Sequence, residues 1–199
     1  MGTLKDICDE AKVVGTQIDI TGCHYGLHSR TKRDIGETEY YRFLAGFARV
    51  TQAMRILEIG THYGGSIKAL ARGADSKASL VTVDLKLHNQ EGFSGCANIH
   101  RVRGDSLAPA TIVEVSKWMA GPIDLMYIDS LHTYDAVMAN ISEYAHLNPE
   151  FIVLDDIHIN ETMDKAWEEL GSRYETCDVS DIADRRRVGF GVVRMRDRG

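Results

Sequence analysis

After residue 54, short apolar stretches rich in β-branched residues alternate with stretches whose apolar residues recur every three or four positions. The short runs are typical of buried strands, and the second spacing is typical of amphipathic helices. The predicted strands cover residues 56–59, 79–84, 98–102, 123–128, 151–154, 174–179 and 188–195. The predicted helices between them cover residues 66–72, 110–119, 133–147 and 160–170. Strands separated by helices favour an α/β fold with a seven-stranded sheet, mostly parallel with an antiparallel C-terminal strand, and helices on both faces.

The chain before residue 55 lies outside this alternation and is predicted to form N-terminal helices. Residues 1–12 show one amphipathic pattern, and residues 39–50 show a second, whose apolar face should pack on the sheet. Tyr40 and Phe47 of the second helix are expected to be exposed enough to form a dimer contact, so a homo-oligomer is one expectation.

Segment 21–29 lies between these helices and is rich in glycine, histidine and aromatic residues. That composition fits a lid over the sheet edge, and it fits a surface connection equally well. The predicted organisation is therefore residues 1–54 as N-terminal helices with a candidate lid, and residues 55–199 as one compact unit.

The composition of the 199-residue chain is that of an ordinary globular protein, with 44% hydrophobic and 26% charged residues. The net charge of −6 argues against nucleic acid as a partner, because proteins bind phosphates through cationic contacts. No apolar run approaches the roughly 20 residues that span a bilayer. The first residues carry no apolar signal core, so we expect a cytoplasmic protein without a membrane partner. The cysteines form no C-x-x-C pair and are expected to be free thiols: Cys8, Cys23, Cys96 and Cys177.

The stretch 55–66 reads Arg-Ile-Leu-Glu-Ile-Gly-Thr-His-Tyr-Gly-Gly-Ser and is the most informative part of the chain. A short apolar strand runs into a turn that contains Gly60, Gly64 and Gly65, and a helix begins near Ser66. Strand–glycine turn–helix units bind nucleotide-like cofactors in α/β proteins. The alternative is that these glycines only make a tight connection between strand and helix.

The spacing of the glycines narrows the choice of cofactor. The dinucleotide fingerprint G-x-G-x-x-G needs a second glycine, whose place is taken here by Thr61 or His62, and no phosphate-binding Gly-Lys-Ser/Thr is present. Glu58 beneath the turn suits a cofactor that lacks phosphates and carries positive charge, which its negative charge would help to attract. Asp84 ends the second strand, where a carboxylate accepts hydrogen bonds from ribose hydroxyls. Residues 104–106 (Gly-Asp-Ser) follow the third strand, where an adenine edge would lie.

Three aspartates are predicted at the carboxyl ends of neighbouring strands. Asp129 ends the fourth strand, and Asp155 and Asp156 end the fifth. Neighbouring parallel strands lie about 4.8 Å apart. The three carboxylates can therefore surround one divalent cation, and all-oxygen ligands favour Mg²⁺, Mn²⁺ or Ca²⁺ over zinc. In a regular strand Asp155 and Asp156 point to opposite faces, so both can bind one metal only if the chain has left the strand. The alternative is that these aspartates are helix caps or ion-pair partners.

These motifs in this order resemble a class I S-adenosylmethionine-dependent methyltransferase over about residues 55–195. The resemblance implies a Rossmann-like doubly wound sheet with S-adenosylmethionine as the cofactor. It implies that the glycine turn holds the methionine end, that Asp84 holds the ribose, and that Asp105 and Ser106 hold the adenine. The cofactor-binding residues implied are Glu58, Gly60, Thr61, Tyr63, Gly64, Ser66, Asp84, Asp105, Ser106 and Asp129.

Residues 128–134 and 154–156 are similar to the metal-dependent branch of that class. This branch includes catechol O-methyltransferases, antibiotic-pathway sugar O-methyltransferases, and proteins of the cephalosporin-hydroxylase/rhamnosyl O-methyltransferase type. Catechol-type enzymes bind the metal through two aspartates and an asparagine, whereas the third position here is Asp156. Their lysine base is replaced by His132, whose ordinary pKa of about 6.5 suits deprotonation of a metal-activated hydroxyl. The alternative for His132 is a local hydrogen bond. The residues implied are Asp129, Asp155 and Asp156 as Mg²⁺ ligands, and His132 and Asp129 as catalytic residues.

The sequence therefore predicts methyl transfer to a hydroxyl of a small-molecule acceptor, a catechol or a vicinal diol of a sugar or natural product, in natural product biosynthesis. The alternatives are a metal-independent methyltransferase acting on an amine or carboxylate, and a non-catalytic module that binds the nucleoside. A nicotinamide oxidoreductase is the weakest rival because its glycine spacing is missing. Trp118 and Trp167 lie in helical patterns and are expected in the core. The candidate substrate residues are His24, Tyr25, His28 and His158, and His158 is alternatively a metal ligand or a surface loop residue.

Overall fold

The computed structural model describes residues 2–24, 32–88, 91–94, 96–182 and 188–195. Its seven strands form one sheet in the order β3-β2-β1-β4-β5-β7-β6. The strands are β1 Arg55–Ile59, β2 Ser79–Asp84, β3 Ile99–Arg103, β4 Leu125–Ile128, β5 Phe151–Asp155, β6 Glu175–Asp178 and β7 Phe190–Arg194. The first five pair in parallel, β7 pairs antiparallel with β5, and β6 pairs antiparallel with β7. The predicted fold class is confirmed.

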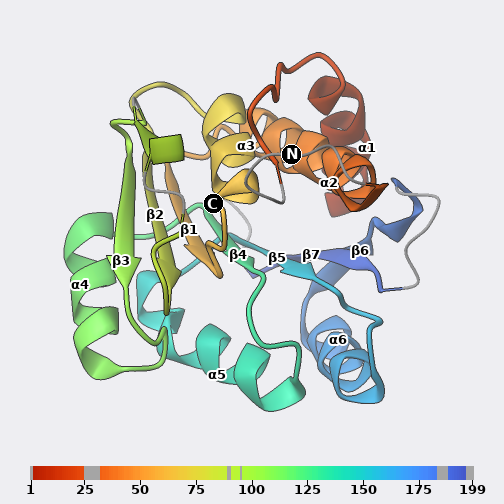
Figure 1. Ribbon diagram of the computed structural model, residues 1–199. Coiled ribbons are helices and arrows are strands. Elements are labelled where there is room, and N and C mark those ends of the chain that lie inside the picture. The colour runs from red at the N-terminus through yellow and green to blue at the C-terminus, as the bar shows by residue number, and fades with distance from the viewer. Residues whose placement is uncertain (1, 25–31, 89–90, 95, 183–187, 196–199) are drawn as a thin grey trace.

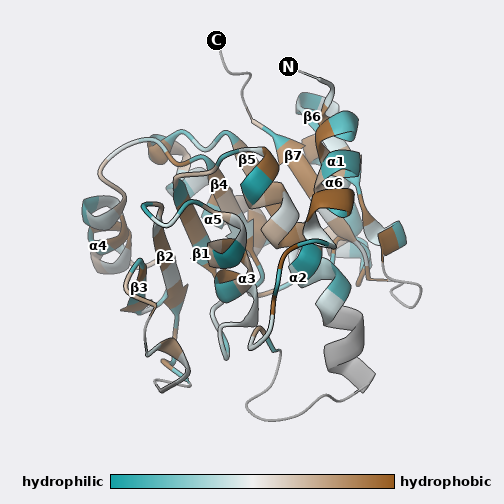
Figure 2. Cartoon of the chain, turned by 90° about the horizontal axis from the view of Figure 1, so that it is seen from above, coloured by the Kyte–Doolittle hydropathy of each residue, from teal (hydrophilic) through white to brown (hydrophobic). Residues whose placement is uncertain are grey.

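Helices cover both faces of the sheet, with α1, α2 and α3 on one side and α4, α5 and α6 on the other (Figure 1). Their bounds are α1 Leu4–Gly15, α2 Lys32–Val50, α3 Gly65–Gly73, α4 Pro109–Met119, α5 Tyr134–Glu143 and α6 Glu161–Arg173. Each face buries its own apolar cluster, and neighbouring strand residues such as Ile56 and Leu57 belong to different clusters. Figure 2 shows the resulting hydrophobic strands between the two layers of helices. Burial on both faces is why these strands are continuous apolar runs rather than alternating patterns.

The strand order reverses beside β1, because the chain continues to β2 on one side and later returns to β4 on the other. In open sheets of this kind the carboxyl ends of the strands diverge at the reversal and leave a crevice. The topology therefore places the ends of β1, β2 and β4 around the position where a ligand is expected.

Helix α2 packs on the sheet as predicted, but its aromatic residues are not available for a dimer contact. Tyr40 is 1% exposed and stacks on Phe190 with ring centroids 4.6 Å apart. Phe47 is fully buried and meets Phe151 edge-on at 5.3 Å. The predicted dimer contact through these residues is therefore wrong, because the helix uses the same apolar face to pack on the sheet.

Trp118 also departs from its prediction. It is 50% exposed instead of buried, and its ring stacks on the imidazole of His100 at a centroid distance of 3.6 Å. Trp167, by contrast, is partly buried and packs against one of the two apolar clusters, as expected. The helical pattern correctly places Trp118 in α4. Because α4 lies at the edge of the sheet, part of this helix stays open to solvent.

The predicted helix starts near residues 133 and 160 are confirmed, whereas the first of these two helices is shorter than predicted. Thr133 accepts a hydrogen bond from the amide of Ala136, and Asn160 caps α6. The helix that starts after Thr133 ends at Glu143 and is followed by a separate 3₁₀ turn, Ala145–Leu147. Tyr144 between them has φ −94° and ψ 4°, which interrupts the regular helical hydrogen-bond ladder.

The N-terminal helices share the core of the sheet, since Leu4 of α1 and Phe47 of α2 join the same apolar cluster as Phe151 of β5. The division of the chain at residue 54 stays a prediction. Most of the predicted lid, residues 25–29, lies outside the described residues. Across the described residues, no helix has the length and apolar character that crossing a membrane requires.

Candidate active site

A cavity of about 450 Å³ lies at the carboxyl ends of β1, β2, β3 and β4, where the strand order reverses. Its lining is largely apolar and contains three carboxylates. The predicted cofactor residues that line it are Gly60, Asp84, Asp105, Ser106 and Asp129. The others are not part of its described lining: Glu58, Thr61, Tyr63, Gly64 and Ser66.

Gly60 follows β1 and packs directly against the backbone at the end of β4. Its φ is +103°, and a Cβ atom there would lie 1.7 Å from the carbonyl oxygen of Asp129. A side chain at this position would push the two strand ends apart. Two positions later, where the dinucleotide fingerprint has its second glycine, His62 adopts the left-handed conformation with φ +46°. The turn thus keeps a glycine-like backbone although the glycine is missing.

Gly64 ends the turn, and the ring of Phe93 leaves no room for a side chain there. Its φ is +80°, and a Cβ atom there would lie 2.1 Å from Cζ of Phe93. The guanidinium of Arg101 lies 4.1 Å from the centre of the same ring. Tyr63 packs against the imidazole rings of its neighbours instead, with His62 at 4.4 Å. Phe93 follows β2 in a stretch without a regular apolar pattern, so no sequence signal marked it.

Glu58 is fully buried beneath the turn. Its carboxyl group accepts hydrogen bonds from the hydroxyls of Ser66 and Thr82, and the hydroxyls of Thr82 and Thr61 lie 2.5 Å apart. Burial raises the pKa of Glu58 to about 8, although the two hydrogen bonds act in the opposite direction. The raised pKa reduces the negative charge that this carboxyl carries at neutral pH. The aspartates of the lining then contribute more than Glu58 to the attraction expected for a cationic cofactor.

Asp84 is held at the cavity wall by the backbone on both sides. One carboxylate oxygen accepts the amide hydrogen of His62 at 2.8 Å, and the other accepts that of Lys86 at 3.0 Å. Each oxygen retains a lone pair that can accept a further hydrogen bond. Asp105 is held in the same way by the amide of Leu107 at 2.9 Å. The geometry therefore suits the predicted binding of ribose hydroxyls at Asp84.

Two of the three predicted aspartates, Asp129 and Asp155, lie together with His132, whereas Asp156 lies beside this group at His132. Asp155 is the last residue of β5, and Asp156 has a left-handed φ of +55°, so the chain leaves the strand between them. The Nε2 atom of His132 lies 3.5 Å from a carboxylate oxygen of Asp129 and 3.8 Å from one of Asp156. Ligand atoms of Asp129, His132 and Asp155 all lie within 4.8 Å of one another. The chain thus leaves the strand at Asp156, as a shared site requires, but His132 takes the place of Asp156 in the group of close ligand atoms.

Burial and crowding perturb the titration of this cluster. Asp155 is 8% exposed, and burial raises the pKa of its carboxyl well above the ordinary value, with the charges of Asp129 and Asp156 adding to the rise. Burial lowers the pKa of His132, but the nearby carboxylates of Asp129 and Asp156 outweigh it, so the pKa is raised overall. Carboxylates this close repel one another unless a proton or a cation lies between them.

The donor set fits a hard divalent cation. The carboxylates of Asp129 and Asp155, with Asp156 nearby, supply the oxygen ligands that Mg²⁺, Ca²⁺ and Mn²⁺ prefer. Oδ1 of Asp155 is buried and accepts no hydrogen bond from the described residues. Imidazole ligands are more typical of zinc, copper or iron sites than of magnesium sites. We therefore expect His132 to lie beside such an ion and not to coordinate it.

The candidate substrate residues are only partly placed. Both ring nitrogens of His158 are occupied, Nδ1 by Asp164 at 2.7 Å and Nε2 by Asp178 at 3.0 Å, which leaves neither for a metal. The backbone carbonyl of His24 lies against the start of α3, where a Cβ atom on Gly65 would come within 2.6 Å of it. Two more of these candidates, Tyr25 and His28, lie outside the described residues.

Sequence reasoning missed Asn140, which lies on α5, is 2% exposed and lines the cavity. A signal was present in the sequence. Asn140 is four residues after Ala136 and four before Tyr144, so it shares their helix face. An amide on a face that otherwise packs inward is a candidate for a polar contact inside a site.

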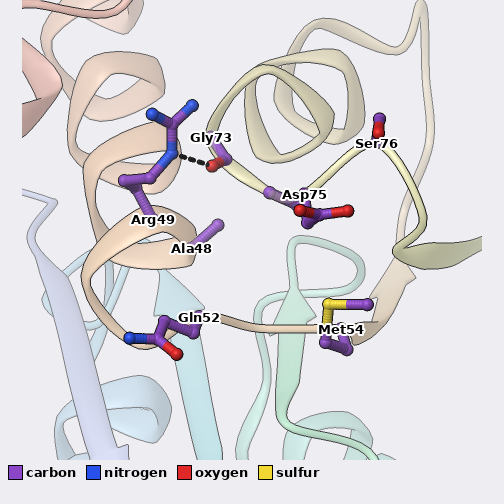
Figure 3. A pocket seen from close by; sticks show the side chains of 8 residues that line it. Ala48, Arg49, Gln52, Met54, Gly73, Asp75 and Ser76 are labelled. Atoms are coloured by element: carbon purple, nitrogen blue, oxygen red, sulfur yellow. Dashed lines mark hydrogen bonds between the residues drawn. The ribbon is translucent and has the colours of Figure 1, made fainter.

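A second cavity, of about 550 Å³, lies at the opposite edge of the sheet, where β1 and β2 begin (Figure 3). Its charged groups bond to nearby backbone. Arg49 donates to the carbonyls of Gly73 at 2.5 Å and Arg72 at 3.1 Å, and Asp75 accepts the amide hydrogen of Lys77 at 2.8 Å. These contacts serve the local structure, and they leave the first cavity as the candidate active site.

A sheet of this order with its cavity at the strand reversal defines the Rossmann-like class of methyltransferase folds, and solved structures agree. The cofactor-bound structure of Rv0187 from MTB matches 97% of this chain and 91% of its own, with a TM-score of 0.65 and 20% identity. The O-methyltransferase TomG from Streptomyces achromogenes, solved in complex with SAM, matches 95% of this chain and 91% of its own, with a TM-score of 0.66 and 18% identity. Likeness at these identities shows the fold.

The family follows from the sequence itself. Residues 50–175 match the model of the family described as Rhamnosyl O-methyltransferase/CmcI, and the chain belongs to this family. A curated relative, O-methyltransferase hkm8 of Aspergillus hancockii, is 30% identical over 120 residues, or 57% of this chain. The chain spans about half the length of that relative, 46%. The resemblance inferred from the glycine turn and the aspartates is confirmed at the level of family and fold.

Proposed function

We propose that this protein transfers the methyl group of S-adenosylmethionine to a hydroxyl oxygen of a small molecule, with a divalent cation, Mg²⁺, in the acidic cluster. The observation that carries this proposal is that Asp129 belongs both to the cavity and to the acidic cluster. It lines the cavity proposed for the methyl donor, and its carboxylate also lies 3.5 Å from His132 in the cluster. Donor and acceptor would therefore adjoin, which the alignment of oxygen, methyl carbon and sulfur requires.

Asp129, Asp155 and Asp156 would hold the cation. When bound, the ion supplies positive charge that attracts two neighbouring oxygens of the acceptor and lowers the pKa of one hydroxyl. The buried oxygen of Asp155, which accepts no hydrogen bond from the described residues, supports this role. The acidic lining at Asp84, Asp105 and Asp129 supports binding of a sulfonium cofactor, because it favours positive charge.

Nε2 of His132 is the proposed proton acceptor. The carboxylates of Asp129 and Asp156 lie 3.5 Å and 3.8 Å from it and stabilise the imidazolium that proton uptake creates. As the acceptor oxygen bonds to the methyl carbon, the bond from that carbon to sulfur breaks and a neutral thioether leaves. The hydroxyl proton passes to Nε2 of His132 and from there to solvent.

The acceptor class is proposed from the family and from its relatives. The family is described as Rhamnosyl O-methyltransferase/CmcI, and TomG is an O-methyltransferase involved in tomaymycin synthesis. We therefore propose an acceptor with two adjacent hydroxyls, a catechol or a vicinal diol of a sugar or another natural product. A cytoplasmic location and the absence of a nucleic-acid partner are part of this proposal, the latter because the net charge is −6.

The test is methyl transfer to a panel of catechols and sugar vicinal diols, with EDTA and after Mg²⁺ is added back. EDTA should abolish transfer and Mg²⁺ should restore it. Asp129→Ala should lower transfer by roughly 100-fold or more, since changes even behind the ligands of a metal site cost about 10–100-fold. Asp75→Ala, in the second cavity, is the matched control and should change transfer by less than about twofold.

Two outcomes would replace this proposal. Transfer that is insensitive both to EDTA and to Asp129→Ala would remove the metal and favour metal-independent transfer to an amine or carboxylate. Binding of S-adenosylhomocysteine without transfer to any acceptor of the panel, Mg²⁺ being present, would favour a non-catalytic module that binds the nucleoside.

A further inference from the structure

The N-terminal helix α1 packs beside the edge strand β6 (Figure 2). At one end of this contact, a carboxylate oxygen of Glu175 accepts the amide hydrogen of Leu4 at 2.7 Å. Towards the other end, the ammonium group of Lys12 donates to the carboxylate of Asp181, just after β6, at 2.9 Å. These two contacts fix how the helix is aligned along the strand.

Two cysteines, Cys8 and Cys177, face each other between these contacts. Cys8 is four residues after Leu4 and four before Lys12, so the three share one face of α1. Cys177 is two residues after Glu175 and therefore lies on the same face of β6. Four helical residues advance about 6 Å and two strand residues about 6.6 Å, so the two steps match. Cys8 is fully buried in an apolar cluster, and the partly buried Cys177 packs against the same cluster.

The two free thiols are in direct contact, and their surroundings make them chemically different. The thiol of Cys8 donates a hydrogen bond to the sulfur of Cys177. This bond lowers the pKa of Cys177, and the charges of Lys12 and Lys5 add to the effect, against burial and the charge of Asp9. The same bond, together with burial, raises the pKa of Cys8. The partly exposed sulfur therefore becomes a thiolate, the nucleophilic form, more readily than the buried one.

We propose that Cys8 and Cys177 form an oxidative modification site, at which a peroxide joins them in a reversible disulfide between α1 and β6. The thiolate of Cys177 attacks one oxygen of the peroxide, the O–O bond breaks, and a sulfenic acid forms as hydroxide leaves. The sulfur of Cys8 then attacks the sulfur of Cys177, and the hydroxyl group leaves as water with the thiol proton of Cys8. The two sulfurs lose two electrons, which reduce the peroxide. A thiol reductant reverses the bond by exchange.

The disulfide would tie the start of the chain to the far edge of the sheet. A cross-link between residues far apart in sequence restricts the unfolded chain strongly, so this bond should stabilise the folded protein. We expect the Tm of the oxidised chain to lie roughly 5–10 °C above that of the reduced chain, and dithiothreitol should reverse the rise.

The test is to treat the reduced full chain with a small excess of hydrogen peroxide, to alkylate the remaining thiols under denaturing conditions, and to map the peptides by mass spectrometry. The reduced chain has four cysteines and should take up four alkyl groups. The oxidised chain should take up two fewer, and the peptides of Cys8 and Cys177 should be joined. Cys96 is partly exposed, as Cys177 is, so Cys96→Ser is the matched control and should still form the bond.

A second variant tests the order of the steps. In Cys8→Ser no thiol displaces the hydroxyl group, so Cys177 should remain a sulfenic acid that dimedone labels, whereas Cys177→Ser should leave Cys8 unlabelled. Full alkylation of the wild type after peroxide, or a disulfide between other cysteines, would overturn the pairing. Oxidation of Cys177 to the sulfinic acid with Cys8 still alkylated would overturn it as well, because Cys8 would then have failed to react.

Discussion

Two cavities in the described part of the chain differ little in size and strongly in chemistry. The one at the carboxyl ends of the strands measures about 450 Å³ and has Asp84, Asp105 and Asp129 in its lining. The one at the amino ends measures about 550 Å³, and its charged residues Arg49 and Asp75 are bonded to nearby backbone. Volume alone would select the second cavity. The chemistry of the lining and the position in the sheet select the first.

Chain direction explains why the two ends differ. Parallel strands end, and the helices that follow them begin, at the same edge of the sheet, as α3 does after β1 and α5 after β4. Helix N-termini carry partial positive charge and tolerate carboxylates, whereas helix C-termini favour cations. Arg49 at the last carbonyls of α3 is the corresponding cation at the other edge. Chain direction therefore favours carboxylates at the first edge and accounts for the position of Arg49 at the second.

The largest expected difference between the cavities concerns two aspartates with the same local geometry. Asp84 and Asp75 each accept the amide hydrogen of the residue two positions later, Lys86 at 3.0 Å and Lys77 at 2.8 Å. Asp84→Ala should weaken binding of S-adenosylhomocysteine by about 10–100-fold, since hydrogen bonds to a charged group contribute about 1.5–3 kcal/mol. Asp75→Ala should leave the affinity unchanged, as isothermal calorimetry of both variants can establish.

Similar losses in the two aspartate variants would contradict this comparison. That result would mean that Asp84 acts through the turn it stabilises and not through a contact with the ligand. An unchanged affinity in Asp84→Ala would remove the ribose contact from the proposed site altogether.

The next largest effect is on the pH dependence of the free energy of unfolding, and it concerns Glu58. Burial raises its pKa from 4.5 to about 8 in the folded chain. Between these values the folded state holds a proton that the unfolded state has lost, so the free energy of unfolding falls as the pH rises through this window. The fall should approach about 1.4 kcal/mol per pH unit. Urea denaturation of the wild type and of Glu58→Gln between about pH 5.5 and 7.5 measures it, and the variant should lack this slope.

Parallel pH profiles for the wild type and Glu58→Gln would refute the raised pKa. Glu58 would then be ionised beneath the turn, and its charge would again be available to attract a cationic cofactor, as the sequence suggested.

The smallest effect is expected at the second cavity. Arg49→Met removes the hydrogen bonds to the carbonyls of Gly73 and Arg72 and the favourable charge at the end of α3. We expect a loss of about 1 kcal/mol, or roughly 2–4 °C in Tm, by thermal denaturation. Binding of S-adenosylhomocysteine should stay unchanged. A loss of binding without a loss of stability would connect the second cavity to the function.

The sequence by itself was sufficient for the features that depend on local order along the chain. The alternation of apolar runs and helical patterns predicted the sheet and the helix starts near residues 133 and 160, where the structure has the caps Thr133 and Asn160. The glycine turn and Asp84 marked the end of the sheet that has the acidic cavity. These features follow from periodicity, capping and strand direction, which neighbouring residues determine among themselves.

Only the tertiary structure decided which side chains are buried, which meet, and which face a cavity. Tyr40 and Phe47 turned inward because the sheet offered their helix an apolar face. Burial away from water raised the pKa of Glu58, and the packing of α5 placed Asn140 in the lining of the cavity. Burial and long-range contact arise from how segments far apart in the chain are brought together, and no local pattern contains that information.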